Sequence, residues 1–288
     1  MHYNSIFRPD LFKGQVHIVT GGGSGIGRCI AHELAALGAH VVIMGRKQEK
    51  LDVVVAEIEA AGGAASAQVC DIRDEANVAA AVASVLAAQG RIDGLVNNAG
   101  GQFFSPLKDI TTKGFEAVVR NNLTGGFNMM REVYNQWMAD HGGAIVNMIV
   151  DMWMGLPNFA HSGAARAGMH SLTQSAACEW AASGVRVNSI AAGMIMSSGF
   201  DNYDGDGVKF IQESANNTPM QRVGTVAEVS SPIVFLLSPG AAYITGTALQ
   251  VDGGSPVARR YYKLTPHTNS PRYQGFHLDS TPDLFRQD

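Results

Sequence analysis

Short apolar runs rich in Val and Ile alternate with longer helical patterns along most of the chain. Continuous apolar strands that alternate with helices are typical of a parallel sheet buried on both faces. The pattern therefore predicts an α/β fold, a doubly wound, parallel, seven-stranded sheet with helices on both faces. The strands are predicted at 16–19, 41–44, 67–70, 94–97, 144–148, 185–188 and 248–251, and the helices at 29–37, 49–61, 75–88, 112–139 and 162–182.

Two segments depart from this alternation. Residues 194–218 are rich in Gly, Asp and Asn, and they follow the carboxyl end of the sixth strand, where ligands bind in open α/β sheets. We interpret them as a lid over the substrate, with a disordered excursion as the alternative. Residues 255–288 show no period and are expected to lie on the surface or on a neighbouring subunit. The predicted organisation is one dinucleotide-binding catalytic domain over 1–254 and a C-terminal extension over 255–288.

Composition narrows the class of protein. Nearly half of the 288 residues are hydrophobic, which is enough for a large core, and the net charge of −4 gives no reason to expect nucleic acid. No apolar run approaches the length of a membrane span. The cysteines, Cys29, Cys70 and Cys178, are odd in number and widely spaced, so we expect reduced core thiols and no metal site. With no signal pattern at the N-terminus, we expect a cytoplasmic protein.

A glycine-rich turn joins the first strand to the first helix. Glycine permits positive φ and lets the backbone approach a pyrophosphate, while the helix N-terminus offers N–H groups and a positive dipole end. A turn in this setting predicts the phosphate site of a Rossmann dinucleotide fold, and a plain tight turn is the alternative. The residues expected to bind the cofactor here are Gly21, Gly23, Ser24, Gly25, Ile26 and Gly27.

The residues after the second strand bear on the choice of cofactor. An acidic residue there would bind the ribose hydroxyls of NAD, but this chain has Gly45, Arg46 and Lys47. Two cations can pair with a 2′-phosphate, so NADP(H) is the predicted cofactor, with a pair of solvated surface charges as the alternative. Asp71 and Ile72 follow the third strand and are expected at the adenine.

Four motifs together resemble the short-chain dehydrogenase/reductase family: 20–27, 97–100, 122–125 and 251–254. The resemblance covers about residues 12–254 and implies an NAD(P)-dependent oxidoreductase. It also implies that the long helices pair between subunits, giving a homodimer or homotetramer. Further cofactor contacts are implied for Asn98, Ala99 and Gly100 below the nicotinamide ribose, for Arg166, and for Gly193 and Ile195.

The chain departs from this family where its usual Ser, Tyr and Lys would stand. The corresponding positions hold Ile149, Ser162 and Arg166. Reducing a ketone produces an alkoxide that needs a good proton donor, whereas reducing the C=C bond of an enoyl thioester produces an enolate that hydrogen bonds can stabilise. The loss of Tyr therefore disfavours carbonyl chemistry most. Arg166 is a poor proton donor, but it can hold the ribose and supply positive charge.

One branch of the family, the peroxisomal trans-2-enoyl-CoA reductases, resembles this chain further. The likeness lies at 100–103, 105–106, 137–138, 141–143 and 161–168. It implies NADPH-dependent reduction of a 2-enoyl-CoA in fatty acid metabolism. The related 2,4-dienoyl-CoA reductases have a Tyr where counting back from Arg166 reaches Asp151 here.

Four residues form the candidate catalytic set, and each has a structural alternative. Asn122 would hold a water or an enolate oxygen, or its amide would only satisfy the backbone. Ser162 would donate to the thioester oxygen, or it would cap the helix. Arg166 would anchor the ribose, or it would form a buried ion pair. Asp151 would be an acid with a raised pKa, or an ordinary loop carboxylate.

The leading hypothesis is an NADPH-dependent enoyl-CoA reductase that transfers hydride to Cβ. The rivals are an NADP-dependent alcohol or aldehyde dehydrogenase for a bulky substrate such as a terpenoid, and an NADP-binding subunit without turnover. Gln102 is expected to contact a substrate amide, and His170 to serve in packing or subunit contact. An acyl-CoA site needs cations for the CoA phosphates. If the candidate cations face away from the pocket, the hypothesis of a smaller terpenoid substrate is favoured. The candidates are Arg222, Arg259, Arg260 and Lys263.

Overall fold

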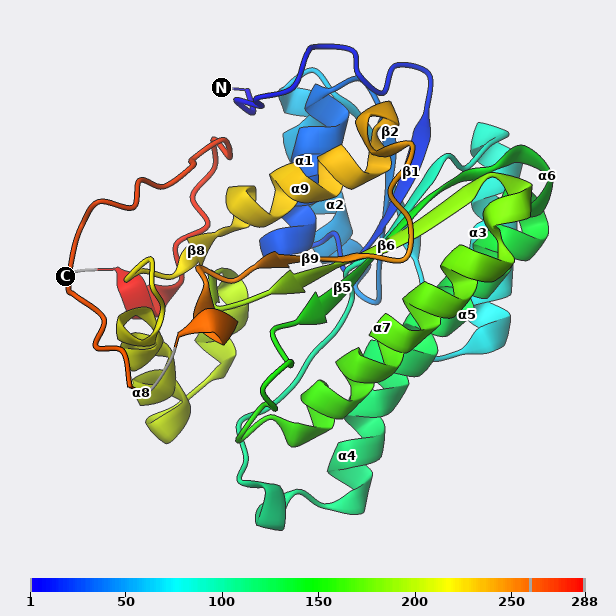
Figure 1. Ribbon diagram of the computed structural model, residues 1–288. Helices are drawn as coiled ribbons and strands as arrows, with labels where there is room; N and C mark the ends of the chain where they lie inside the picture. Colours follow the sequence, from blue (N-terminus) through cyan, green and yellow to red (C-terminus); the bar gives the residue numbers. More distant parts are fainter. Residues whose placement is uncertain (1, 259–260, 287–288) are drawn as a thin grey trace.

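A computed structural model describes residues 2–258 and 261–286. Its centre is a parallel sheet of seven strands in the order β3-β2-β1-β4-β5-β6-β9 (Figure 1). The predicted α/β, doubly wound sheet is therefore confirmed. The strands are β1 (Val16–Thr20), β2 (His40–Gly45), β3 (Ala64–Val69), β4 (Gly94–Asn97), β5 (Gly143–Val150), β6 (Val185–Ala192) and β9 (Ala248–Val251).

Helices cover both faces of this sheet (Figure 1). One buried apolar cluster lies under α1 (Gly25–Ala36), α2 (Gln48–Ala60) and α9 (Val226–Leu237). The other lies under α3 (Glu75–Gln89), α5 (Gly125–Val133) and α7 (Ala160–Glu179). No helix in the described part of the chain is long and apolar enough to cross a bilayer.

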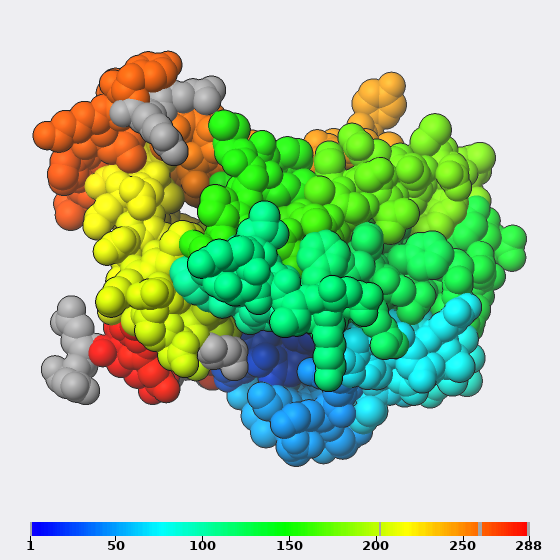
Figure 2. All heavy atoms as spheres, turned by 90° about the horizontal axis from the view of Figure 1, so that it is seen from below, coloured from blue at the N-terminus to red at the C-terminus, as the bar shows by residue number. Residues whose placement is uncertain are grey.

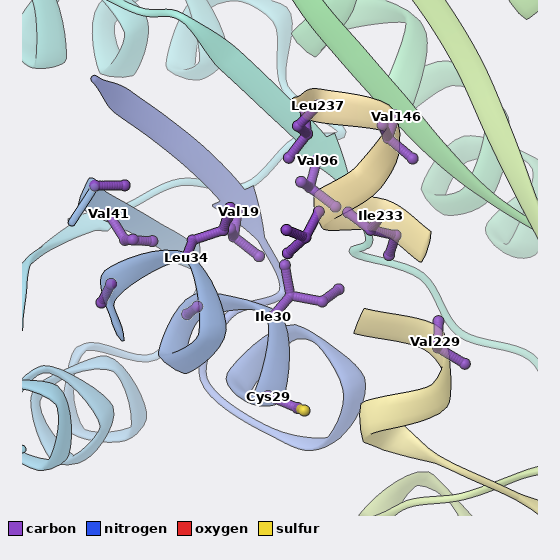
Figure 3. Close-up of a cluster of buried hydrophobic side chains, with 14 of the residues drawn as sticks. Val19, Cys29, Ile30, Leu34, Val41, Val96, Val146, Val229, Ile233 and Leu237 are labelled. Carbon is purple, nitrogen blue, oxygen red and sulfur yellow. The ribbon is translucent and has the colours of Figure 1, made fainter. Parts of the chain in front are cut away.

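The sequence prediction missed α9, although this helix carries a large part of the core. Its Val229 and Ile233 are fully buried in the same apolar cluster as Ile30 and Leu34 of α1 (Figure 3). A capping box starts the helix, because Thr225 Oγ1 accepts from the Glu228 N–H at 3.2 Å and Glu228 Oε2 accepts from the Thr225 N–H at 2.9 Å. A Thr followed three residues later by Glu, ahead of an apolar run, is the sequence pattern of such a start.

The long helix predicted at 112–139 is present but interrupted. It consists of α4 (Thr112–Val119), α5 and the short α6 (Ala139–His141), joined by π-helical turns at Arg120–Thr124 and Tyr134–Met138. A π turn changes the direction in which side chains leave the helix, and such turns often occur at functional sites. The first of them contains Asn122.

The segment 194–218 is folded rather than a disordered excursion. It contains β7 (Ile195–Met196), which pairs with β8 (Gly224–Thr225), a 3₁₀ turn at Ser198–Asn202, and α8 (Gly205–Ser214). We call 194–218 the lid segment. Figure 2 shows it in yellow beside the red end of the chain.

The C-terminal segment lies on the surface of this same chain. The Arg222 guanidinium donates to the carbonyl oxygens of Ser270 and Pro271, and the Tyr273 hydroxyl donates to the Asn4 carbonyl at 2.8 Å. Near its end, the Asp283 N–H donates to Asp201 of the lid segment at 2.8 Å. Residues 265–285 therefore connect the N-terminal segment with the lid.

One sequence expectation about the cysteines is wrong. Cys29 and Cys70 are buried as expected, but Cys178 is exposed on α7. All three are free thiols.

Candidate functional site

A cleft of about 400 Å³ opens at the carboxyl ends of the strands on the β1–β3 side of the sheet. In a doubly wound sheet this edge is where ligands bind. The structure also brings residues to the cleft that the sequence did not single out, namely Met44, Lys50, Leu51, Asn121 and Ser197–Gly199. The predicted cofactor residues that line it are Gly21, Gly23, Ser24, Gly25, Ile26, Arg46, Lys47, Asp71, Ile72, Asn98, Ala99 and Gly100.

Four predicted cofactor residues lie behind or beside the lining of this described cleft. Gly27 packs against Gly21 within the glycine-rich turn, and Arg166 lies beneath Gly100. Gly193 faces Asp252, whose Cα is 2.7 Å from an ideal Cβ built on the glycine. Ile195 is buried in β7 beside Gly224. The sequence identified the region of these residues, but not which way each one faces.

The floor of the cleft depends on the hydroxyl of Thr20 at the end of β1. Its Oγ1 accepts from the backbone N–H groups of Asn98 and Ala99, each at 3.0 Å, and donates to the Val96 carbonyl. Asn98 Nδ2 in turn donates to the Thr20 carbonyl at 2.9 Å. These bonds hold the ends of β1 and β4 together. Thr20 is almost fully buried, so water cannot readily replace them.

The glycine-rich turn is shaped for close backbone approach. Gly21 and Gly25 have φ of +67° and +53°, which other residues rarely adopt. A Cβ on Gly27 would lie 2.4 Å from the Gly21 carbonyl oxygen, so no side chain fits there. Ser24 is the N-cap of α1, yet its side chain makes no capping bond. Its hydroxyl and the helix N-terminus therefore suit the pyrophosphate of a dinucleotide.

Three cations line one rim of the cleft: Arg46, Lys47 and Lys50. All three side chains are exposed, and they have no hydrogen bond or ion pair with any residue that the structure describes. Asp71 also lines this rim, but the Arg73 guanidinium donates to its carboxylate at 2.6 and 2.8 Å and lowers the pKa of Asp71 to about 2. The rim thus keeps uncompensated positive charge.

The guanidinium of Arg166, a partly buried residue, is next to this floor. Nη1 donates to the Met148 carbonyl of β5 at 2.5 Å, and Nη2 reaches Asn122 Oδ1 at 3.5 Å. A Cβ on Gly100 would clash with Nη2, so only glycine fits above it. Burial lowers the pKa of Arg166 to about 10, and its buried Nε has no partner among the described residues. The anticipated ion pair is not formed, because its partners are a carbonyl and an amide.

Asn122 uses both ends of its amide on one residue. Oδ1 accepts from the Gly101 N–H at 2.9 Å, and Nδ2 donates to the Gly101 carbonyl at 2.8 Å. The side chain is 2% exposed. It therefore fixes the backbone of the loop that follows β4, at the point where that loop borders both Arg166 and the cleft.

Helix α7 begins two residues earlier than predicted, at Ala160, with Phe159 as its N-cap. Ser162 is therefore not the N-cap, and that alternative is wrong. The side chains of Ser162 and the preceding His161 are fully buried, and neither Ser162 Oγ nor His161 Nε2 has a partner among the described residues. Buried polar atoms without partners are rare in folded proteins.

Two carboxylates lie together beyond the ends of β5 and β9. Burial raises the pKa of Asp151, and the negative charge of Asp252 raises it further, while the Ser255 hydroxyl and the Trp153 backbone oppose the shift. Asp252 Oδ2 is buried without a hydrogen-bond partner among the described residues. Asp151 therefore keeps a proton to higher pH than an ordinary aspartate. The sequence did not single out Asp252, although it lies in a motif noted there.

Aromatic side chains from three segments meet at the start of α7. Phe104 comes from the loop after β4, Phe159 caps α7, and Tyr203 and Phe210 come from the lid segment, with ring centroids 5.6 to 6.0 Å apart. The Tyr203 hydroxyl accepts from Gln102 Nε2 at 3.2 Å. This contact engages Gln102, which was expected to meet substrate.

Two other sequence candidates have simple structural roles. His170 packs edge-on against Trp153, with ring centroids 5.2 Å apart, in keeping with packing. Arg222, a candidate for CoA phosphates, donates to Glu228 at 2.7 and 2.8 Å and is mostly buried, so it is not available for a ligand. Lys263 is exposed, and the candidates Arg259 and Arg260 lie outside the described residues.

No group of three metal-binding side chains occurs in the part described.

Comparison with known proteins shows the family to which this chain belongs. A family model described as enoyl-(acyl carrier protein) reductase matches residues 21–255. The chain belongs to the short-chain dehydrogenase/reductase family. A curated short-chain dehydrogenase/reductase relative, the peroxisomal 2,4-dienoyl-CoA reductase of Danio rerio, is 36% identical over 257 residues, 88% of this chain and 85% of the relative.

Solved structures of the family agree. The citronellol catabolism dehydrogenase of Pseudomonas aeruginosa PAO1 is 54% identical, with a TM-score of 0.79 over 88% of this chain and 99% of that protein. A Beutenbergia cavernae protein described as an NAD(P)-dependent gluconate 5-dehydrogenase, with NADP bound at low occupancy, is 34% identical, with a TM-score of 0.79 over 87% and 100%. The chain is thus an oxidoreductase of a family that uses NAD(P).

The hydrogen bonds of the Thr20 hydroxyl give a testable prediction for this short-chain dehydrogenase/reductase. Thr20→Val keeps the shape of the side chain but leaves the Ala99 N–H without its acceptor and the Asn98 N–H with only the Val96 carbonyl, which should lower the free energy of unfolding by about 2 kcal/mol. Thr20→Ser retains the hydroxyl and should lose about 1 kcal/mol. Urea unfolding measures both. Equal losses for the two variants would contradict the role given to the hydroxyl.

Proposed function

We propose that this protein is an NADPH-dependent reductase that saturates the C=C bond of a trans-2-enoyl-CoA by hydride transfer to Cβ. The observation that carries the proposal is the buried Arg166–Asn122 pair beneath Gly100, next to a Ser at position 162. A fixed positive charge and hydrogen-bond donors favour a developing enolate. They do not supply the proton that an alkoxide needs, because Arg166 stays charged near neutral pH.

The shape of the site and its relatives support an extended acyl substrate. The aromatic residues above α7 form an apolar surface between the lid segment and the loop after β4. The Danio rerio relative is named a 2,4-dienoyl-CoA reductase, and such an enzyme also acts on a C=C bond conjugated to a thioester.

The cleft fits a dinucleotide, which supplies the hydride when bound. We assign the pyrophosphate to the turn at 21–27 and the α1 N-terminus, and a 2′-phosphate to Arg46 and Lys47. Asn98, Ala99 and Gly100 line the opposite end of the cleft, where we assign the nicotinamide ribose, with Arg166 behind them.

The reduction must deliver one proton in addition to the hydride. As hydride adds at Cβ, the electron pair of the C=C bond moves toward the thioester oxygen, and the resulting enolate then takes a proton at Cα. The residues suited to hold that proton are Asp151 and its neighbour Asp252, because burial, reinforced by the negative charge of Asp252, raises the pKa of Asp151. Asn122 is a positioning residue, which holds Gly101 and Arg166 in place.

A second candidate is an NADP-dependent dehydrogenase for a terpenoid alcohol or aldehyde. It is favoured by the 54% identity to a citronellol catabolism dehydrogenase and by the engagement of Arg222 with Glu228, which removes one candidate cation for CoA. Against it stands the absence of a tyrosine at position 162.

The proposal also covers the domains of the chain, its oligomeric state and its location in the cell. We propose one catalytic domain over 1–254 in which the lid segment covers the substrate, with residues 255–288 as an extension that braces the lid. We also propose a homodimer or homotetramer through α4, α5 and α7, in the cytoplasm. The Danio rerio relative is named as peroxisomal.

Cofactor preference should depend on the cationic rim. A charge-assisted hydrogen bond contributes about 1.5–3 kcal/mol, so Arg46→Gln with Lys47→Gln should lower kcat/KM for NADPH by about 10- to 100-fold. The value for NADH should change by less than about 2-fold, because NADH has no 2′-phosphate. Lys13→Gln, an exposed cation elsewhere, is the control. Equal losses with both cofactors would contradict the assignment.

Turnover tests the reaction itself. The wild type should oxidise NADPH with a medium-chain trans-2-enoyl-CoA faster than it reduces NADP⁺ with citronellol. Asn122→Ala should lower kcat by roughly 10²-fold with a smaller change in KM, because the positions of Gly101 and Arg166 matter most in the transition state.

The other outcomes separate the alternatives. Turnover of the alcohol alone would overturn the enoyl proposal and favour the dehydrogenase, with Asp151→Asn as the next variant. Tight NADPH binding with no turnover of either substrate would favour a cofactor-binding subunit.

A further inference from the structure

His161 has one buried ring nitrogen, Nε2, that makes no hydrogen bond within the described part of the chain. Its side chain is 0% exposed, at the first turn of α7, and its Nδ1 accepts from the backbone N–H of Ser162 at 2.9 Å. A backbone N–H can only donate, so Nδ1 must be unprotonated. In the neutral ring the proton then lies on Nε2, and Nε2 has no partner among the described residues. The fold thus holds the Nε2–H in one tautomer with no acceptor at hydrogen-bonding geometry in the described chain, although the Phe159 backbone lies near the ring.

The ring remains neutral at the pH of a cell. Burial lowers the pKa of His161, a shift that the Phe159 backbone only opposes in part. The N-terminus of the 20-residue helix α7 is the positive end of a dipole, which also disfavours a charged imidazole there. No Asp, Glu, Lys or Arg side chain in the described part makes a hydrogen bond or ion pair with this ring. A neutral imidazole at a helix N-terminus is an electrophile suited to a developing oxyanion.

The surroundings of His161 point to the substrate rather than to solvent. Phe103 covers the ring edge-on, with centroids 4.2 Å apart, and is itself 39% exposed. It lies in the same loop as Gly100 and Gly101, which border Arg166 and Asn122. Phe159, the cap of α7, belongs to the aromatic surface assigned to the acyl group. Displacement of the Phe103 ring would uncover the part of the His161 ring that it now contacts.

We propose that His161 is a catalytic residue whose Nε2–H donates a hydrogen bond to the thioester oxygen of the substrate, in place of the hydroxyl missing at position 162. The inference rests on the proposed function, because it requires an oxygen that gains negative charge during reduction. Ser162 Oγ, also buried without a partner in the described chain, is the neighbouring donor that completes the pair.

The test uses two substitutions at one position. His161→Leu removes the donor, whereas His161→Gln places an amide N–H near the position of Nε2. His141→Leu, at an exposed histidine at the far end of the long helix, is the matched control. All three variants are first compared with the wild type in NADPH affinity, by cofactor fluorescence, and in thermal unfolding. Both should change little.

The decisive readout is the absorbance of a bound 2,4-dienoyl-CoA in the presence of NADP⁺, where no reduction occurs. A hydrogen bond to the thioester oxygen polarises the conjugated chain and shifts its absorption to longer wavelength. The wild type, His141→Leu and His161→Gln should show this red shift, and His161→Leu should lose it. With NADPH and a trans-2-enoyl-CoA, His161→Leu should lower kcat by about 100-fold with a smaller effect on KM, and His161→Gln should recover at least about 10-fold of that loss.

The outcomes separate this inference from the proposed function. If the wild type neither binds the dienoyl-CoA nor reduces an enoyl-CoA, the proposed function fails. If the wild type does both and His161→Leu retains the red shift and kcat, the role of His161 is overturned while the proposed function stands. If His161→Leu does not fold, an unshifted spectrum for folded His161→Gln overturns it equally.

Discussion

The site depends on the accommodation of one partly buried cation, the guanidinium of Arg166. It is held by the Met148 carbonyl at the end of β5 and by the Asn122 amide in the π turn of the long helix. A charge in this position is costly unless it is paired or hydrogen-bonded, so these partners and the glycine at position 100 are constrained together. The lowered pKa of Arg166 reflects that cost, yet the group stays charged and its field acts on whatever lies above Gly100.

Around this cation the fold gathers polar groups that ordinarily would face water. The carboxyl ends of β1 and β4 meet at Thr20 and Asn98, and two helix N-termini, those of α1 and α7, point toward the same edge of the sheet. Helix N-termini favour negative charge, which suits phosphates at one end and an enolate oxygen at the other. Among the described residues, His161 Nε2 and Ser162 Oγ lack hydrogen-bond partners at the second of these helices, and Arg166 Nε lacks one beside the cofactor cleft. Buried polar atoms without partners therefore occur at both ends of the candidate site.

The sheet could be predicted from the sequence because each strand is a short, continuous apolar run, and the cofactor turn because its glycines follow a strand directly. Helix α9 was not predicted, although Thr225 and Glu228 form the capping pattern at its start, because the glycine-rich segment 194–218 before it breaks the alternation of strands and helices. The role of Arg222 could not be predicted, because its ion pair with Glu228 depends on how α9 begins, and its other partners at positions 270 and 271 are far along the chain. The same holds for His161: its importance comes from a missing partner, which only the three-dimensional arrangement reveals.

The central claim is that the hydride adds to a carbon–carbon double bond in a site without a tyrosine donor. The most direct test is to follow deuterium from NADPH labelled at the transferable position into the product, by mass spectrometry and NMR. Incubation with a trans-2-enoyl-CoA in ordinary water should give the saturated acyl-CoA with deuterium at Cβ and solvent hydrogen at Cα. Deuterium found only on the carbinol carbon of a terpenoid alcohol formed from its aldehyde, with none in the acyl-CoA, would contradict the account.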